Sequence, residues 1–174
     1  MATWNVDASH TNVGFSVKHM MVSKVRGRFT EVEGTIEGNP EDLTNAQINF
    51  KIHVSSIHTN SDDRDNHLRS ADFFDVEKYP YITFSSTEIV KTGNNEYKIT
   101  GDMTMKDVTK KATFEAEYVG SGKNPWGVDL AAFEVEGKVS RKEFGLTWNQ
   151  TLETGGVLVG DDIKITLELQ ANPA

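Results

Sequence analysis

Alternation between apolar and polar residues, with a period of two, runs through most of this chain and restricts its fold more than any other feature. In AQINFKIHV, residues 46–54, every second side chain is apolar, and Gln, Asn, Lys and His take the positions between them. The same pattern recurs in residues 13–19, 111–118, 131–139 and 163–169. Successive side chains of a β-strand point to opposite faces of a sheet. These segments are therefore predicted to be strands with one buried and one solvated face.

Weaker alternation predicts further strands at residues 29–36, 82–89 and 97–105, which makes about eight or nine strands in all. Residues rich in Gly, Asn, Asp and Pro separate the strands and predict turns at 38–42, 92–95, 120–127 and 160–162. Such strands build either an antiparallel sandwich or an up-and-down barrel. A length of 174 residues suits one domain, residues 1–174.

The composition excludes several classes of function. Acidic residues outnumber basic ones by 26 to 18, a net charge of -8, so the chain is a poor nucleic-acid binder and should be repelled by anionic lipid surfaces. The absence of Cys excludes disulfides, thiolate metal sites and a cysteine nucleophile. No signal peptide and no run long enough to span a membrane is visible, so a cytoplasmic protein is expected.

One segment, Ser61–Tyr79, interrupts the alternation. Ser61 can cap a helix, and the two aspartates after it suit the positive end of the helix dipole. Arg69 falls near the opposite end, four residues after Asp65 in the favourable order for an ion pair. We therefore predict a short helix at about residues 61–71, anchored by the apolar side chains Leu68, Phe73 and Phe74.

This segment has two interpretations. It can be a solvated charged face beside core phenylalanines, or a plug at the mouth of a barrel, with His67, Arg69 and Asp72 at the rim. These three side chains could form an acid–base set of a hydrolase or isomerase. However, their spacing is generic, and the sequence contains no G-x-S-x-G nucleophile motif. We therefore expect no catalytic residues here.

Metal and cofactor sites are not expected. The five histidines form none of the spacings H-x-H, H-x-x-x-H or H-E-x-x-H, and no glycine-rich loop carries the lysine of a phosphate-binding loop. His19 continues the apolar face of residues 13–17, which indicates an interior or rim histidine. In SRKEFGLTWN, residues 140–149, Phe144 and Trp148 share a parity, which predicts a strand whose aromatic face is either core or a pocket wall.

Four stretches resemble the YceI-like family. They are WNVDASHTNVGFSVKHMMVSKVRGRF at 4–29, RDNHLRSADFFDVEKYPYITFSS at 64–86, GDMTMKDVTKKATFEAE at 101–117, and residues 140–171. The second is the most specific, because His67, Leu68, Asp72 and the Phe pair that follows all fall on the family pattern. Met103 stands where the family usually has Leu.

The resemblance implies an all-β fold, an extended eight-stranded antiparallel barrel that is lipocalin-like, with a short helical insertion near residues 61–79 at its mouth. It also implies non-enzymatic carriage or storage of a long-chain apolar lipid, such as a polyisoprenoid or quinone precursor, in an apolar interior. Two alternatives stay open: the hydrolase or isomerase described above, and a structural or stress-response protein whose barrel is filled by its own side chains. A homodimer is permitted.

Parity and resemblance together give the candidate ligand-binding residues. Those expected in the wall are Phe15, Val17, Ile48, Phe50, Phe84, Phe144 and Trp148. Those expected at the rim or lid are His19, His67, Leu68, Arg69, Asp72 and Phe73. The small residues Ala112, Ala116 and Ala131 are expected to widen the interior.

Overall fold

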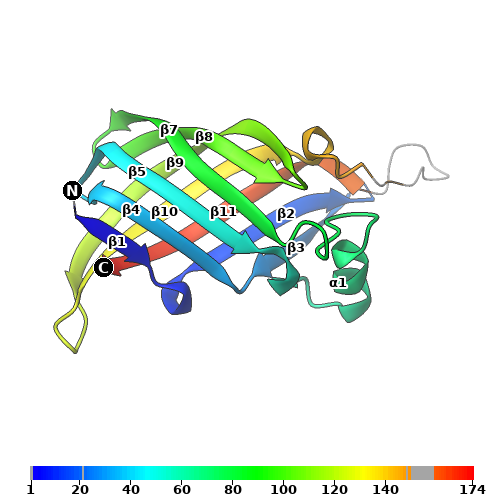
Figure 1. Ribbon diagram of the computed structural model, residues 1–174, viewed down its shortest axis with the longest axis horizontal. Helices are drawn as coiled ribbons and strands as arrows, with labels where there is room; N and C mark the ends of the chain where they lie inside the picture. The colour runs from blue at the N-terminus through cyan, green and yellow to red at the C-terminus, as the bar shows by residue number, and fades with distance from the viewer. Residues whose placement is uncertain (1, 21, 148, 150–158) are drawn as a thin grey trace.

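The computed structural model describes residues 2–20, 22–147, 149 and 159–174, and its fold is all-β with one short α-helix (Figure 1). The strands are β1 (Thr3–Val6), β2 (Asn12–His19), β3 (Ser23–Phe29), β4 (Val32–Asn39), β5 (Asp42–His53), β6 (Ile57–His58), β7 (Tyr81–Gly93), β8 (Glu96–Met105), β9 (Val108–Lys123), β10 (Asp129–Ser140) and β11 (Val159–Pro173). The helix is α1 (Asp62–Arg69), and short 3-10 turns are η1 (Ala8–His10), η2 (Val54–Ser56) and η3 (Arg141–Phe144).

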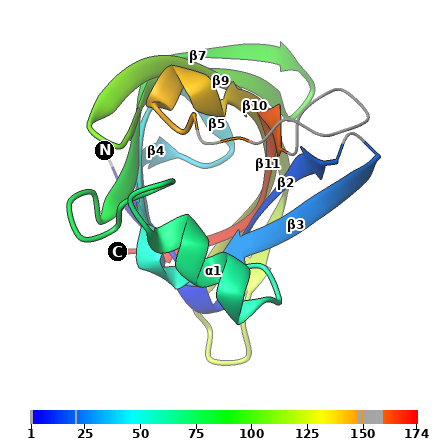
Figure 2. The same cartoon turned by 90° about the vertical axis from the view of Figure 1, so that its right-hand side faces the viewer.

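Eight of these strands close into an antiparallel barrel. The order around the ring is β1-β4-β5-β7-β8-β9-β10-β11, and β1 pairs again with β11 through the register Trp4↔Pro173 to Val6↔Ala171. The view along the barrel shows the ring end-on, with α1 at one mouth (Figure 2). The prediction of an extended, lipocalin-like, eight-stranded antiparallel barrel is therefore confirmed, and the sandwich is excluded.

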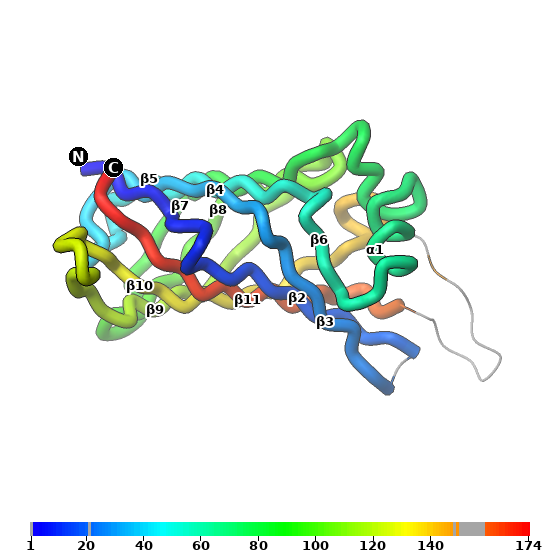
Figure 3. Tube along the Cα trace, turned by 90° about the horizontal axis from the view of Figure 1, so that it is seen from below, coloured from blue at the N-terminus to red at the C-terminus, as the bar shows by residue number. Residues whose placement is uncertain are grey.

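Strands β1 and β2 share one side of β11. β1 pairs with the C-terminal end of β11, and β2 pairs with the remainder, from Val159↔His19 to Glu168↔Asn12. β2 continues as a hairpin into β3, which joins β6 through Arg28↔His58. This hairpin lies at the same end of the barrel as α1, whereas both termini lie at the other end (Figures 1 and 3).

The apolar side chains of the alternating pattern point into the barrel. Inward-facing residues form two contiguous apolar clusters, one toward α1 and one toward the termini, which share partly buried residues such as Phe84 and Val135. Charged residues occupy the outward positions of the same strands, so the buried patterns of β8 and β10 alternate as expected for one-sided strands.

The helix α1 begins and ends close to the predicted positions. The Ser61 hydroxyl accepts a hydrogen bond from the Arg64 amide, and acidic residues fill the first turn. The predicted Asp65–Arg69 ion pair is wrong. Asp65 is only 2% exposed and accepts hydrogen bonds from the Thr59 amide, at 2.9 Å, and the Thr59 hydroxyl. Arg69 instead donates to the carbonyls of residues 55 and 57 at 3.0 Å. Both side chains thus fasten α1 to the segment between β5 and α1.

Three other predictions are wrong in detail. Residues 29–36 are not one strand, because β3 ends at Phe29 and β4 begins at Val32. Residues 160–162 are not a turn but lie within β11, where a β-bulge shifts the register. The predicted strand at 140–149 begins as η3, which ends at Gly145 with a left-handed φ of 80°. A glycine adopts that conformation without strain, and it ends the turn.

Removing the Asp65 carboxylate should loosen the attachment of α1. In Asp65→Ala the Thr59 amide and hydroxyl lose their acceptor, and each buried unsatisfied group costs about 1–3 kcal/mol. We expect the free energy of unfolding, measured with urea, to fall by roughly 2–4 kcal/mol. Asp63→Ala, on the exposed face of the same helix, removes only a charge at the positive end of the helix dipole and should lower it by about 0.3–1 kcal/mol. Equal effects at the two positions would contradict the anchoring role.

Candidate ligand-binding site

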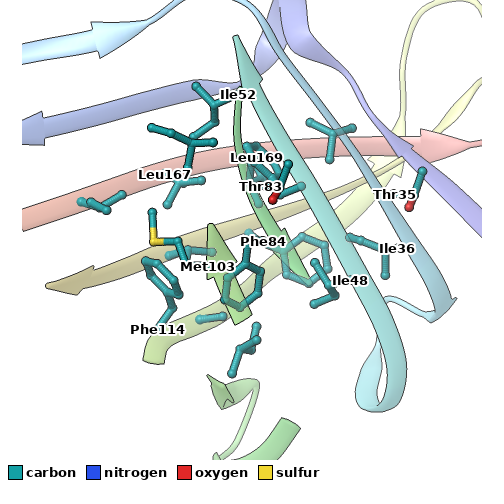
Figure 4. A pocket seen from close by; sticks show the side chains of 18 of the residues that line it. Thr35, Ile36, Ile48, Ile52, Thr83, Phe84, Met103, Phe114, Leu167 and Leu169 are labelled. Atoms are coloured by element: carbon teal, nitrogen blue, oxygen red, sulfur yellow. The ribbon is translucent and has the colours of Figure 1, made fainter. Parts of the chain in front are cut away.

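The barrel interior contains two apolar cavities. The first, the terminal cavity, has a volume of about 90 Å³ and lies toward the chain termini. Figure 4 shows its wall, in which Phe84, Phe114 and Met103 from β7, β9 and β8 face Ile36 and Ile48 from β4 and β5. The side chains of two threonines, at 35 and 83, supply the polar atoms among its described lining residues.

The second cavity, the helix-end cavity, has a volume of about 80 Å³. Leu68 of α1 and the phenylalanines at 73 and 74 line it together with residues from β2, β3 and β11. Four residues line both cavities: Ile52, Ile82, Met103 and Ile165. The two cavities therefore adjoin each other along the barrel, and we call the four side chains that they share the neck.

Four phenylalanine rings lie against the barrel wall because each covers an inward-facing glycine on a neighbouring strand. A Cβ atom added to Gly137 would lie 2.5 Å from the ring of Phe114, and one added to Gly101 would lie 2.5 Å from the ring of Phe84. The same arrangement joins Phe50 to Gly34, at 2.8 Å, and Phe15 to Gly27. Such aromatic coverage of a strand glycine supports the sheet, and here it lets each ring pack closely against the neighbouring strand.

The predicted wall residues lie in three environments. Ile48, Phe50 and Phe84 line the terminal cavity, and Phe15 and Val17 line the helix-end cavity. Phe144 is buried in the core but lines neither cavity, because residues 141–144 form η3 and the strand parity does not hold there. Trp148 lies outside the described residues.

The predicted rim residues also lie in different environments. Leu68 and Phe73 line the helix-end cavity. His67 Nε2 lies 2.9 Å from Asp72 Oδ2, and its ring packs edge-on against Phe73 with centroids 5.0 Å apart. Arg69 directs its guanidinium to backbone carbonyls and to an Asn66 oxygen. The structure thus joins His67 to Asp72 at the helix end, while the hydrogen bonds described for Arg69 lead to other groups. His19 is half-buried at the end of β2, opposite Val159.

Sequence reasoning missed Arg141, the charged residue among the described lining of the helix-end cavity. It is 2% exposed, and it donates to the carbonyls of Leu146, at 2.6 Å, and Gly160, at 2.7 Å. Burial lowers the pKa of its guanidinium, and the nearby Asp161 carboxylate opposes that shift. The only signal in the sequence was a basic pair in SRKEF, and strand parity gave no reason to place one member inside.

Asp161 balances this buried cation. Its carboxylate accepts hydrogen bonds from the Ser140 hydroxyl, at 2.6 Å, and the Lys142 amide, at 3.1 Å, and these bonds lower the pKa of the carboxyl below its ordinary value of 3.8. Within the described ranges, every buried side-chain nitrogen and oxygen has a hydrogen-bond partner. No group of three or more His, Asp or Glu side chains with the arrangement of a metal site occurs in the same residues.

The architecture defines a class of protein: a closed antiparallel barrel with a helix at one end and an apolar interior, as in lipocalin-like proteins. No helix in the described part of the chain is long and apolar enough to cross a membrane. The sequence profile of the YceI-like domain matches residues 4–171. The chain therefore belongs to the YceI-like family.

Comparisons with individual proteins are consistent with this family. A UPF0312 protein of Staphylococcus epidermidis is 41% identical over 165 residues, which is 94% of each chain. The crystal structure of a Campylobacter jejuni YceI protein superposes with a TM-score of 0.75 at 34% identity and covers 95% of both chains. A polyisoprenoid binding domain from Saccharophagus degradans, implicated in plant cell wall breakdown, superposes over 100% of both chains with a TM-score of 0.69. At 10% identity, this last likeness shows the fold alone.

The Asp161 interactions should make stability depend on pH in one direction. Because the folded pKa is lowered, the stabilisation is complete above pH 3.8 and is lost as the pH falls through the folded pKa. Asp161→Ala should lower the free energy of unfolding by about 1 kcal/mol at neutral pH and by progressively less in acid. Denaturant unfolding at a series of pH values measures this. Asp162→Ala, at the exposed next position, is the control, and a pH-independent effect of Asp161→Ala would contradict the assignment.

Proposed function

We propose that the protein is a non-enzymatic carrier or storage protein that holds a long-chain apolar lipid, such as a polyisoprenoid or a quinone precursor, inside the barrel. The observation that carries this proposal is the pair of apolar cavities that adjoin each other along one interior. Apolar side chains make up nearly all of their described lining. An eight-stranded barrel has room for one slim ligand, and a linear chain is slim, long and apolar.

The size of the cavities restricts how such a chain can bind. Each is smaller than the roughly 150 Å³ dry cavity that admits benzene in an engineered protein. A long chain must therefore occupy both, and the neck must open to admit it. Met103 forms part of the neck, and an unbranched methionine can change rotamer to accommodate different contents. Burial of the chain stabilises the complex by roughly 25 cal/mol per Å² of apolar surface.

The proposed contacts follow from the lining. Phe15, Val17, Leu68 and Phe73 would contact the part of the chain near α1, and Ile48, Phe50 and Phe84 the part near the termini. The hydrogen-bonded pair of His67 and Asp72 lies where a polar head group would sit at the helix end. A protein of the same fold supports the proposal that the ligand is a long apolar lipid, since the Saccharophagus degradans domain is a polyisoprenoid binding domain. The whole chain, 1–174, would act as one lipid-binding domain.

A second candidate is a structural or stress-response protein whose barrel is filled by its own side chains. The small volumes, about 90 and 80 Å³, favour it. The hypothesis of a hydrolase or isomerase has less support, because Arg69 donates to backbone carbonyls and the hydroxyl of the adjacent Ser70 donates to the His67 carbonyl.

Native mass spectrometry of the purified protein, followed by solvent extraction, separates these candidates. Carriage predicts a discrete adduct that is released as a polyprenyl or other long-chain species. If the purified protein carries nothing, isoprenoids and quinones of graded length are added to it. Failure to bind any of them would assign the protein to the filled-barrel class.

The Phe50–Gly34 contact offers a variant that changes one cavity. In Gly34→Ala the new Cβ would lie 2.8 Å from the Phe50 ring and from Val6, so the ring must tilt into the terminal cavity. Overpacking of this kind destabilises by about 1–3 kcal/mol. We expect retention of long polyprenyl chains to fall severalfold, with a smaller effect on short chains that fit in the helix-end cavity alone.

The matched control is Gly122→Ala in β9, where an added Cβ would meet no atom within 4 Å. It should leave chain-length preference unchanged. An equal loss of long and short chains in Gly34→Ala would show that the two cavities do not hold successive parts of one ligand.

A further inference from the structure

The negative charge of the chain is unevenly distributed. Residues 12–30 contain four Lys or Arg residues and no Asp or Glu, although the whole chain has 26 acidic residues. This stretch forms β2, β3 and the hairpin between them. All four cations, Lys18, Lys24, Arg26 and Arg28, are exposed on the outer face of the barrel.

Strand register extends this cluster across two further strands. Ser16 of β2 lies between Arg26 of β3 and Lys164 of β11, and Lys164 pairs in turn with Lys138 of β10. In the next row toward the hairpin, Lys18 pairs with Lys24. With neighbouring strands about 4.8 Å apart, the four strands span roughly 14 Å. We call the six residues Lys18, Lys24, Arg26, Arg28, Lys138 and Lys164 the basic face.

The cations of the basic face are available for an external partner. Among the described residues, none of the six takes part in an ion pair. The exposed acidic residues next to them are Asp162 on β11, Glu136 on β10 and Glu115 on β9, which pairs with Glu136. The glutamates at 117, 134 and 168 lie farther toward the termini. The basic face therefore keeps an excess of positive charge on a protein of net charge -8.

An exposed apolar tip adjoins the basic face. In the turn between β2 and β3, Val22 is 91% exposed and Met20 is 48% exposed. Lys18 and Lys24 flank this tip on either side in the sequence and pair across the hairpin. Figures 2 and 3 show the hairpin extending beside the mouth that α1 occupies.

The basic face and the exposed apolar tip together indicate one kind of partner. Scattered exposed apolar residues are normal, and a basic surface alone would suit any polyanion. Cations that surround an exposed apolar tip are typical of a surface that binds anionic lipids, where headgroup phosphates meet the cations and the tip enters the acyl boundary. We propose that the outer face of β3, β2, β11 and β10 docks on an anionic phospholipid bilayer, with Met20 and Val22 inserted between headgroups.

The charges also set the orientation of the docked barrel. The exposed Asp62, Asp63 and Asp72 in and after α1 would be repelled by the same bilayer. The barrel therefore docks on the side of its β2–β3 hairpin and not with the α1 mouth facing the lipid. This places a wall of the helix-end cavity against the membrane, because Val17 lines that cavity from the strand that carries Lys18 outward. The docking itself does not depend on the proposed carriage of lipid.

Vesicle co-sedimentation tests the proposal with the full chain. The vesicles are phosphatidylcholine alone, or phosphatidylcholine with one-third phosphatidylglycerol as a probe, and neither contains an isoprenoid. We expect partitioning onto the anionic vesicles to exceed that onto the neutral ones at least tenfold at low salt, and to fall as salt is raised. Native mass spectrometry of the same sample reports separately on bound lipid, so failure of docking and failure of carriage are distinguishable.

Two variants and a matched control locate the contact. Each cation near an anionic surface contributes about fivefold to partitioning, so Lys24→Glu/Arg26→Glu should reduce binding at least tenfold. Val22→Ser should reduce it severalfold without changing the charge. Lys91→Glu/Lys98→Glu makes the same charge change at exposed positions of β7 and β8, on the side of the ring opposite β11, and should have little effect. Circular dichroism and thermal melting verify that each variant is folded.

Three outcomes would overturn the proposal. One is equal partitioning onto neutral and anionic vesicles, and another is an equal loss of binding in the charge variant and its control. The third is no vesicle binding by the wild type. If, in that case, duplex DNA or RNA is bound and Lys24→Glu/Arg26→Glu abolishes that binding, the basic face belongs to a nucleic-acid site instead.

Discussion

The packing of phenylalanine rings over inward-facing glycines is the interaction on which the open interior of this barrel depends. Eight strands enclose a space that ordinary core side chains can fill. Here the rings of Phe50, Phe84 and Phe114 occupy room that a Cβ would take on an adjacent strand, so each ring packs closer to the wall than any other residue at the glycine position would allow. Each glycine therefore has two effects on the interior. It makes room for a phenylalanine ring next to the strand, and it leaves unfilled volume on the other side of that ring. The terminal cavity is lined by all three of these phenylalanines.

The α1 end of the barrel is held together differently, by polar groups. Asp65 accepts from Thr59, Arg69 donates to two carbonyls of the segment before α1, and Arg141 donates to carbonyls on both sides of the 147–158 segment. A buried charge is tolerated when its hydrogen bonds are made, and these bonds fix a geometry more tightly than apolar contacts do. The helix-end cavity thus has a fixed polar frame, whereas the neck between the cavities consists of apolar side chains that can repack.

The period of two predicted the strands well, because it comes directly from strand geometry. It left a sandwich and a barrel both open, and the resemblance to the YceI-like family implied the barrel. The position of α1 was also predicted from local chemistry, namely the Ser61 cap and the acidic residues of the first turn. The errors arose where tertiary pairing overrides local pattern. The bulge at 160–162 keeps residues with turn chemistry inside β11, and η3 cancels the parity that grouped Phe144 with the wall. Arg141 was missed because it lies in η3, where strand parity does not apply, and because two of its carbonyl partners are 18 and 19 residues away. The basic face was missed because the net charge of -8 describes only the chain as a whole.

Register connects the interior of the barrel to its exterior. In β2, Phe15 and Val17 face the helix-end cavity, while Lys18 faces outward beside the apolar hairpin tip. A slip of one residue would exchange these faces, placing lysine in the cavity and apolar side chains in water. The Phe15 ring over Gly27 opposes such a slip, because only glycine at that position of β3 leaves room for the ring. One close contact inside the barrel therefore sets both which side chains a bound chain would meet and which charges the outer surface presents.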